Sequence, residues 1–395
     1  MINRLPIFLL DLDGVLIEPR GYRLAIQSTL KWFTNRMGLG DLYPGEDAIA
    51  GFEAISMTNE WDIIAILLAA IFDRLVNENP SLCLPRDLLE ACDVVHDQNL
   101  DPPKINLVNI KGTLSENFKP GLQYADLAFE LSRLGDGCQL FKAMASHPLL
   151  ENILTRTRML DGSLTTRVFQ HFTLGSHKFE EFTGIKAFFD SESFLLKHDR
   201  VLLKEETRES FLQVWRQAKC GAVIFTARPS LPQTGRAFTY NYSPEAEIAM
   251  QALQLSELLL IGGGKMGWLA SRLGFPIEQL TKPSPVQALA AIGTAVTRQS
   301  ELSLQAAADF WFKGVADFYN NLPPLSIHVF EDSGGNIKSV QHAVEQLNVA
   351  GIDIHFKAWG ISENPQKQQA LREAGAVLVP DINQALQNAF HDEKL

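Results

Sequence analysis

The stretch Ile7-Phe-Leu-Leu-Asp-Leu-Asp-Gly14 joins an apolar run directly to two carboxylates and a glycine. A short, continuous apolar run that ends in a turn is typical of a buried strand in a parallel sheet. Asp11 and Asp13 lie two residues apart, so on an extended chain their side chains point to the same side. Two like charges that are buried together are costly unless a cation or a proton lies between them. The stretch therefore predicts a strand with a chemically active pair at its carboxyl end.

Apolar runs of the same kind recur in the second half of the chain and alternate there with helix-like segments. The predicted strands are Ala222–Phe225, Leu258–Ile261, Ser326–Phe330, Ile352–Phe356 and Ala376–Val379. The predicted helices are Glu206–Ala218, Pro244–Leu253, Ile337–Leu347 and Asn364–Ala374. Strands that alternate with helices indicate an open α/β sheet with right-handed crossovers. We expect a Rossmann-like parallel sheet as the core of the protein.

The segment between the first and second predicted strands has a different pattern. It contains long apolar-periodic stretches, such as Trp61–Leu75, Leu122–Leu134 and Leu149–Arg158, and few strand signals. We interpret residues 18–204 as a mostly helical domain that is inserted into the sheet domain. Residues 1–17 and 205–395 then form the sheet domain.

The overall charge argues against a protein that binds duplex DNA. Lys and Arg total 35 and Asp and Glu total 46, which gives a formal net charge of −11. Binding to duplex DNA needs a basic face, whereas a small anionic substrate needs only a local cluster of cations. The best candidate for a membrane span, Ile63–Ile71, is far too short to cross a bilayer. We expect neither a nucleic-acid partner nor a membrane partner.

The four cysteines, Cys83, Cys92, Cys138 and Cys220, form no CxxC pair and have no spacing suited to zinc. We interpret them as reduced thiols. The apolar run Leu5–Leu10 leads straight into acidic residues, unlike a secretory signal. These two features predict a cytoplasmic protein.

Three more segments carry chemically active residues after or between the later strands. They are Phe225-Thr-Ala-Arg-Pro229, Thr281-Lys-Pro-Ser-Pro285 and Glu331-Asp-Ser-Gly-Gly-Asn336. Each signal is weak alone, because such a threonine is usually a cap, such a lysine is usually exposed, and such acids often lie in a loop. However, ligands of an open α/β sheet bind at the carboxyl ends of the strands. The shared placement therefore predicts one site. By contrast, the run Gly262–Gly267 lacks the spacing of a phosphate-binding P-loop, and we interpret it as a loop.

In their order and context these motifs resemble the haloacid dehalogenase superfamily, on its phosphatase side. The resemblance rests on Asp11–Gly14, Thr226, Lys282 and Glu331–Ser333, and its segments span about half of the chain. Three stretches of the inserted domain are similar to phosphoglycolate-phosphatase-like members. They are Gly21–Ala25, Thr58–Asp62 and Phe169–Gly175. The resemblance implies that residues 18–204 form an enlarged helical cap, in which about 77–150 are an extra insertion.

The resemblance also implies a mechanism and a cofactor. Asp11 would attack phosphorus, and Asp13 would protonate the leaving alcohol and later activate water. Thr226 and Lys282 would bind the phosphoryl oxygens. Mg²⁺ would be held by Asp11, the Asp13 carbonyl, Asp332 and Glu331. The sequence departs from the family at two places, with Glu331 where glycine is frequent and Asn336 where a second aspartate is frequent.

The function predicted from these residues is that of a Mg²⁺-dependent phosphatase of a small phosphorylated metabolite. Arg228, Arg20, Asn59 and Trp61 are the residues predicted to line the substrate mouth. One alternative is a phosphomutase that acts on a sugar phosphate. Another is a non-catalytic binding or regulatory protein that kept the fold, although the presence of Asp11, Asp13 and Lys282 argues against it. The sequence leaves the substrate and the oligomeric state open.

Overall fold

The computed structural model describes residues 4–55, 57–119, 122–134, 140–233 and 242–395. It divides the chain into two compact units, a sheet unit (Met1–Pro19 and His198–Leu395) and a helical unit (Arg20–Lys197). The junctions predicted from the sequence lie at 17/18 and 204/205. In the structure, β2 (Ile17–Glu18) and β3 (Arg200–Val201) pair antiparallel where the chain leaves and re-enters the sheet unit. This short ladder belongs to the sheet unit.

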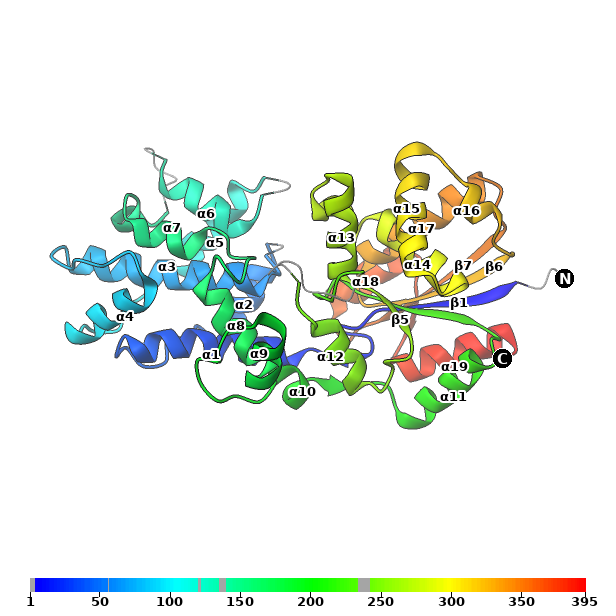
Figure 1. Cartoon of the computed structure of the whole chain (residues 1–395), viewed down its shortest axis with the longest axis horizontal. Coiled ribbons are helices and arrows are strands. Elements are labelled where there is room, and N and C mark those ends of the chain that lie inside the picture. The colour runs from blue at the N-terminus through cyan, green and yellow to red at the C-terminus, as the bar shows by residue number, and fades with distance from the viewer. Residues whose placement is uncertain (1–3, 56, 120–121, 135–139, 234–241) are drawn as a thin grey trace. The chain divides into compact units, whose positions relative to one another are not determined.

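The sheet unit contains six parallel strands, which confirms the predicted α/β core (Figure 1). The strands are β1 (Leu5–Leu10), β4 (Gly221–Phe225), β5 (Leu259–Ile261), β6 (Leu325–Glu331), β7 (Ile354–Ile361) and β8 (Val377–Val379). Their order across the sheet is β5-β4-β1-β6-β7-β8. The chain therefore builds outward from β1 through β4 to β5, and then returns to the other side of β1 at β6. Such a reversal of strand order is where open α/β sheets bind ligands.

Helices cover both faces of the sheet. They are α11 (Glu205–Arg216), α12 (Glu245–Ala252), α13 (Gly263–Leu273), α14 (Pro285–Thr297), α15 (Ser300–Lys313), α16 (Asp317–Asn320), α17 (Gly334–Val349), α18 (Pro365–Glu373) and α19 (Ile382–Glu393). Alternate residues of β1 enter different cores. Ile7 and Leu9 pack with α13, α14, α15 and α17, whereas Phe8 and Leu10 pack with α11, α12 and α19. Figure 1 shows α14, α15 and α17 on one face and α11 and α19 on the other.

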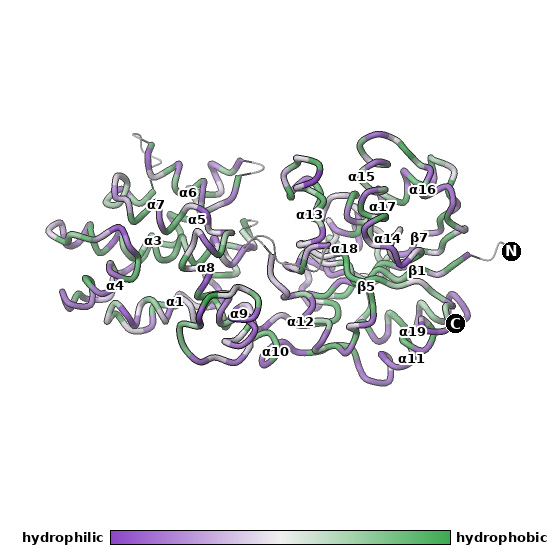
Figure 2. Tube along the Cα trace, viewed as in Figure 1, coloured by the Kyte–Doolittle hydropathy of each residue, from purple (hydrophilic) through white to green (hydrophobic). Residues whose placement is uncertain are grey.

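The inner strands β4 and β6 of the sheet are completely buried. All seven residues of β6 and all five of β4 are buried. Figure 2 shows hydrophobic residues concentrated in the middle of the sheet, whereas the surrounding helices alternate between hydrophobic and hydrophilic residues. The continuous apolar runs of the sequence are therefore strands that are covered on both sides, as expected for a parallel sheet.

Two expectations from the sequence were wrong in detail. The predicted strand Ile352–Phe356 begins and ends too early, because the backbone N–H of Ile352 still bonds to Leu347 in the turn after α17, and β7 continues to Ile361. The run Gly262–Gly267 is not a loop but the start of α13. Its glycines are needed because a Cβ on Gly264 would overlap the carbonyl oxygen of Ser230.

The helical unit packs around α3 (Glu60–Glu78), in which every residue from Trp61 to Phe72 is buried. The other helices are α1 (Arg20–Arg36), α2 (Glu46–Glu53), α4 (Leu88–Asp97), α5 (Leu107–Glu116), α6 (Tyr124–Ser132), α7 (Pro148–Leu154), α8 (Leu164–Leu174), α9 (Ser176–Thr183) and α10 (Phe194–His198). Apolar residues of α4, α5 and α6 belong to the same core cluster as α1 and α3. The described part of 77–150 therefore shares the core of this unit.

Two further sequence expectations concern cysteines and membranes. Cys83, Cys92 and Cys220 are free thiols, and Cys138 lies outside the described residues. Within the described ranges, no helix combines the length and the hydropathy that crossing a bilayer requires.

Candidate active site

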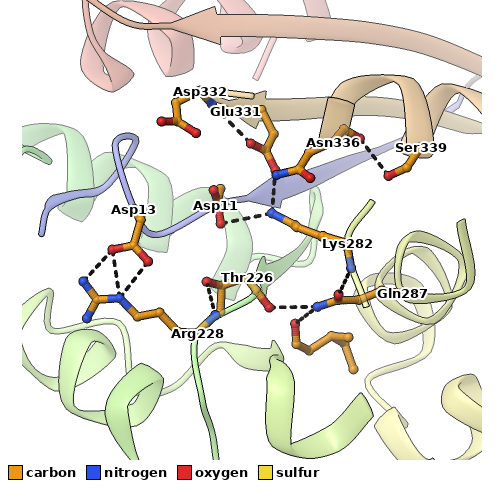
Figure 3. Close-up of polar contacts among 11 residues, drawn as sticks. Asp11, Asp13, Thr226, Arg228, Lys282, Gln287, Glu331, Asp332, Asn336 and Ser339 are labelled. Atoms are coloured by element: carbon orange, nitrogen blue, oxygen red, sulfur yellow. Dashed lines mark hydrogen bonds and ion pairs between the residues drawn. The ribbon is translucent and has the colours of Figure 1, made fainter. Parts of the chain in front are cut away.

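The site lies in the sheet unit, where Asp11 follows β1, Thr226 follows β4 and Glu331 ends β6. Lys282, which precedes α14, extends its ammonium group between two of the acids (Figure 3). The Nζ atom of Lys282 lies 3.0 Å from Asp11 Oδ1 and 2.5 Å from Glu331 Oε1. The structure thus brings together three of the residues that the sequence assigned to one site.

Burial dominates the electrostatics of this cluster. Desolvation raises the pKa of Asp11 well above its ordinary value, and the charge of Glu331 raises it further, while Lys282 lowers it. Desolvation also raises the pKa of Glu331, against the opposing effect of Lys282. Burial lowers the pKa of Lys282, but Asp11 and Glu331 more than offset this, so its pKa is raised. The three groups therefore depend on one another for their charged forms.

Asp332 completes a group of three carboxylates that fits a divalent cation. One carboxylate oxygen each from Asp11, Glu331 and Asp332 lies within 4.8 Å of the others. Hard oxygen ligands of this kind suit Mg²⁺. Lys367 on α18 forms an ion pair with Asp332. The repulsion among three carboxylates and the burial of Asp11 and Glu331 are what a bound cation would relieve.

Asn336, at the place where the family frequently has a second aspartate, lies in the first turn of α17. Its side chain forms a hydrogen bond to Glu331, which lowers the pKa of that carboxyl group. Its backbone oxygen accepts a hydrogen bond from Ser339 Oγ at 2.8 Å. Asn336 therefore contacts one of the three carboxylates directly.

Thr226 is buried at the end of β4, and its hydroxyl oxygen accepts the backbone N–H of Arg228 at 3.1 Å. The hydroxyl hydrogen is left to donate elsewhere. The Gln287 side chain fixes this segment, because its Nε2 donates to the backbone carbonyl oxygen of Thr226 at 2.8 Å while its Oε1 accepts the backbone N–H of Lys282 at 2.8 Å. Gln287 was not among the residues predicted from the sequence. Its signal was a single amide in the otherwise apolar run Val286–Ile292.

Asp13 points away from the Lys282 cluster and toward Arg228 (Figure 3). The guanidinium Nε lies 2.9 Å from both carboxylate oxygens of Asp13, and Nη2 lies 2.6 Å from Oδ1. Nη2 also lies 3.0 Å from Asp199 Oδ2. Arg228, predicted at the substrate mouth, is thus buried beside Asp13. Asp199 was missed, because it follows α10 in a segment with no motif.

The remaining residues predicted at the mouth belong to the helical unit. Asn59 caps α3, with its side chain accepting from the N–H groups of Trp61 at 3.1 Å and Asp62 at 3.3 Å. Trp61 is buried in the core of that unit. Arg20 is exposed at the first position of α1. These contacts explain Asn59 and Trp61 as structural residues, and a contact of any of the three with substrate stays a prediction.

Comparisons with known proteins show a likeness of fold to a solved structure. No family model matches the chain, and no curated protein matches it. A target of the Northeast Structural Genomics Consortium, solved by X-ray diffraction, matches with a TM-score of 0.62 at 13% identity over 99% of both chains. Phosphatase Tt82 from Thermococcus thioreducens has a TM-score of 0.48 at 15% identity over 98% of this chain and 99% of its own. At such identities the first likeness is one of fold, and the activity has to be argued from the site.

Proposed function

We propose that this protein is a phosphatase of small phosphorylated metabolites that works through a phosphoryl group on Asp11. The observation that carries the proposal is the convergence of Asp11, Lys282 and Glu331, with Asp332 beside them, at the switch point of the sheet. The resemblance of the four motifs to phosphatases of the haloacid dehalogenase superfamily supports the same reaction. Asp13 favours phosphoryl transfer, because dehalogenases of that superfamily usually lack the second aspartate.

The chemistry requires a nucleophile, an acid and groups that bind the phosphoryl oxygens. Asp11 attacks phosphorus, and the bond from phosphorus to the ester oxygen breaks as Asp13 gives that oxygen a proton. Asp13 then accepts a proton from the water that attacks phosphorus, which frees phosphate and restores Asp11. Thr226 and Lys282 bind the phosphoryl oxygens, whose charge shifts during the transfer.

Asp11, Glu331 and Asp332, with the Asp13 carbonyl, would hold Mg²⁺. Such an ion supplies positive charge that offsets the repulsion between the anionic carboxylate and the anionic phosphate. Lys282 also supplies positive charge there, because its ammonium group lies between Asp11 and Glu331.

The direct test is phosphate release from a panel of phosphorylated metabolites, measured with Mg²⁺, with EDTA and with the Asp11→Asn variant. We expect release that needs both the metal and Asp11. The matched control is Asp353→Asn, which removes an exposed carboxylate that pairs with Arg4. This control should retain the wild-type rate. Release that persists in Asp11→Asn would contradict the proposed nucleophile, and no release from any ester by the wild type would contradict the phosphatase.

A further inference from the structure

Arg228 forms three hydrogen bonds with the carboxylate of Asp13 and also pairs with Asp199. The Arg228 side chain is only 2% exposed and that of Asp199 only 3%, whereas the Asp13 side chain is 34% exposed. The buried guanidinium therefore contacts one buried carboxylate and one accessible carboxylate. Arg228 therefore fixes the Asp13 carboxylate, and the exposed part of that carboxylate remains accessible to a ligand.

The backbone of Arg228 is fixed on both sides. Its N–H donates to Thr226 Oγ1 at 3.1 Å, and its carbonyl oxygen accepts the Gly263 N–H at 2.9 Å from the start of α13. A planar guanidinium presents its donors in a rigid fork, which fixes the orientation of a carboxylate as well as its position. Rotation of the Asp13 carboxyl group would break at least one of its three contacts with Arg228.

Asp199 explains how the buried Arg228 can orient Asp13 even when Asp13 carries a proton. An arginine without a second partner would need Asp13 as its permanent counter-ion, because an unpaired buried charge is strongly destabilising. Asp199 is buried and supplies that counter-ion at 3.0 Å from Nη2. Asp13 is then free to act as a proton donor while Arg228 still orients it.

We propose that Asp199 and Arg228 form a buried pair that positions Asp13 for proton transfer to the leaving-group oxygen. This inference rests on the proposed function, in which Asp13 is the acid. In that step the Asp13 O–H bond and the bond from phosphorus to oxygen break, while bonds from Asp11 to phosphorus and from hydrogen to the leaving oxygen form. The leaving group departs as a neutral alcohol. Asp199 and Arg228 are positioning residues, because they act through Asp13.

Two classes of ester distinguish positioning of the acid from a general structural role. 4-Nitrophenyl phosphate has a leaving group that departs without a proton, whereas an alkyl phosphate from the metabolite panel needs one. For each protein we would measure kcat/KM for both esters, since this parameter reports on formation of the phosphoenzyme. The ratio of the two values does not depend on the fraction of protein that is folded. A poorly folded variant therefore still gives a result.

We expect Asp199→Asn to lower kcat/KM for the alkyl ester by about ten-fold and to change that for the aryl ester by less than about two-fold. Asp199→Glu should restore part of the alkyl rate. The matched control is Glu18→Gln, a carboxylate-to-amide change in β2, where Glu18 pairs with Arg200 at 2.9 Å. This control should leave the ratio unchanged.

An equal loss for both esters in Asp199→Asn would overturn the positioning role and leave the phosphatase standing. An unchanged rate for both would overturn it as well. If the wild type hydrolyses neither ester, the phosphatase itself is contradicted, and the positioning role falls with it.

Discussion

At the scale of one residue, Gly14 lets the turn after β1 lie close to Asp332, one of the three clustered carboxylates. Its φ is +76°, a left-handed conformation that glycine adopts without strain. A Cβ at this position would lie 2.5 Å from Asp332 Oδ2 and 2.9 Å from Asp332 Cγ. The absence of a side chain is therefore what lets Asp332 approach the turn that carries Asp13.

Gly14→Ala should lower metal-dependent phosphate release by at least about ten-fold, because the new methyl group displaces Asp332. The matched control is Gly351→Ala, since Gly351 also has a positive φ, +96°, but a Cβ there would meet no described atom within 4 Å. Both variants should lose about 1–2 kcal/mol of unfolding free energy from backbone strain. Only Gly14→Ala should lose activity. A wild-type rate in Gly14→Ala would show that the position of Asp332 is unimportant.

At the scale of elements, one amide of α14 adds hydrogen bonds at the ends of β4 and β5 to the apolar packing of this helix against the sheet. Gln287 is fully buried and bonds to the carbonyl oxygens of Thr226 and Ile261 and to the N–H of Lys282. Burial of polar backbone groups without partners costs about 1–3 kcal/mol each. The helix thus positions both phosphoryl-binding residues through a single side chain.

Gln287→Ala should lower the free energy of unfolding by about 3 kcal/mol, since it leaves the Thr226 carbonyl oxygen and the Lys282 backbone N–H without the partner that Gln287 supplies. The Ile261 carbonyl oxygen keeps its bond from the Thr226 backbone N–H at 3.2 Å. The comparison is Gln369→Ala on α18, where an exposed glutamine bonds only to Glu373 at 3.0 Å among the contacts described. That change should cost less than about 0.5 kcal/mol. Urea unfolding followed by circular dichroism measures both, and equal stabilities of the two variants would refute the role of Gln287.

At the scale of the whole molecule, the two units have separate hydrophobic cores. The helical unit buries His171 of α8 among phenylalanines, with ring centroids 4.1 Å from Phe189 and 5.0 Å from Phe179. Its Nδ1 accepts the N–H of Phe188 at 3.4 Å, so Nε2 carries the hydrogen and donates to Ser176 Oγ at 2.9 Å. These contacts require the neutral imidazole.

Desolvation lowers the pKa of His171 to about 4, from an ordinary value of 6.5. Below pH 6.5 the unfolded chain binds a proton that the folded chain does not, so stability falls as the pH falls toward 4. The loss from this group should reach about 2 kcal/mol at pH 5. Urea unfolding of the full chain at pH 7 and pH 5 measures it. His171→Gln should remove this part of the pH dependence, whereas His177→Gln, at a side chain that is 90% exposed, should retain it.

The sequence predicted the sheet, and it named Asp11, Thr226, Lys282 and Glu331 for one candidate site, because both inferences depend on local pattern. Apolar runs are strands when both faces are covered, and residues such as Asp11, Thr226 and Glu331 follow those runs directly. Asp199 and Gln287 could not be predicted, because their roles depend on contacts with residues far away in the chain. The start of α13 was missed for a similar reason, since the close approach of Ser230 to Gly264 exists only in the folded protein.

The central claim, at the scale of the whole molecule, is that a phosphoryl group passes through Asp11. The most direct measurement is a rapid acid quench of the enzyme with its best substrate, followed by digestion and mass spectrometry. We predict one phosphoryl group on the peptide that contains Asp11 in the wild type and none in Asp11→Asn. A wild-type protein that releases phosphate, but carries the group on another peptide or on none at any quench time, would contradict the account.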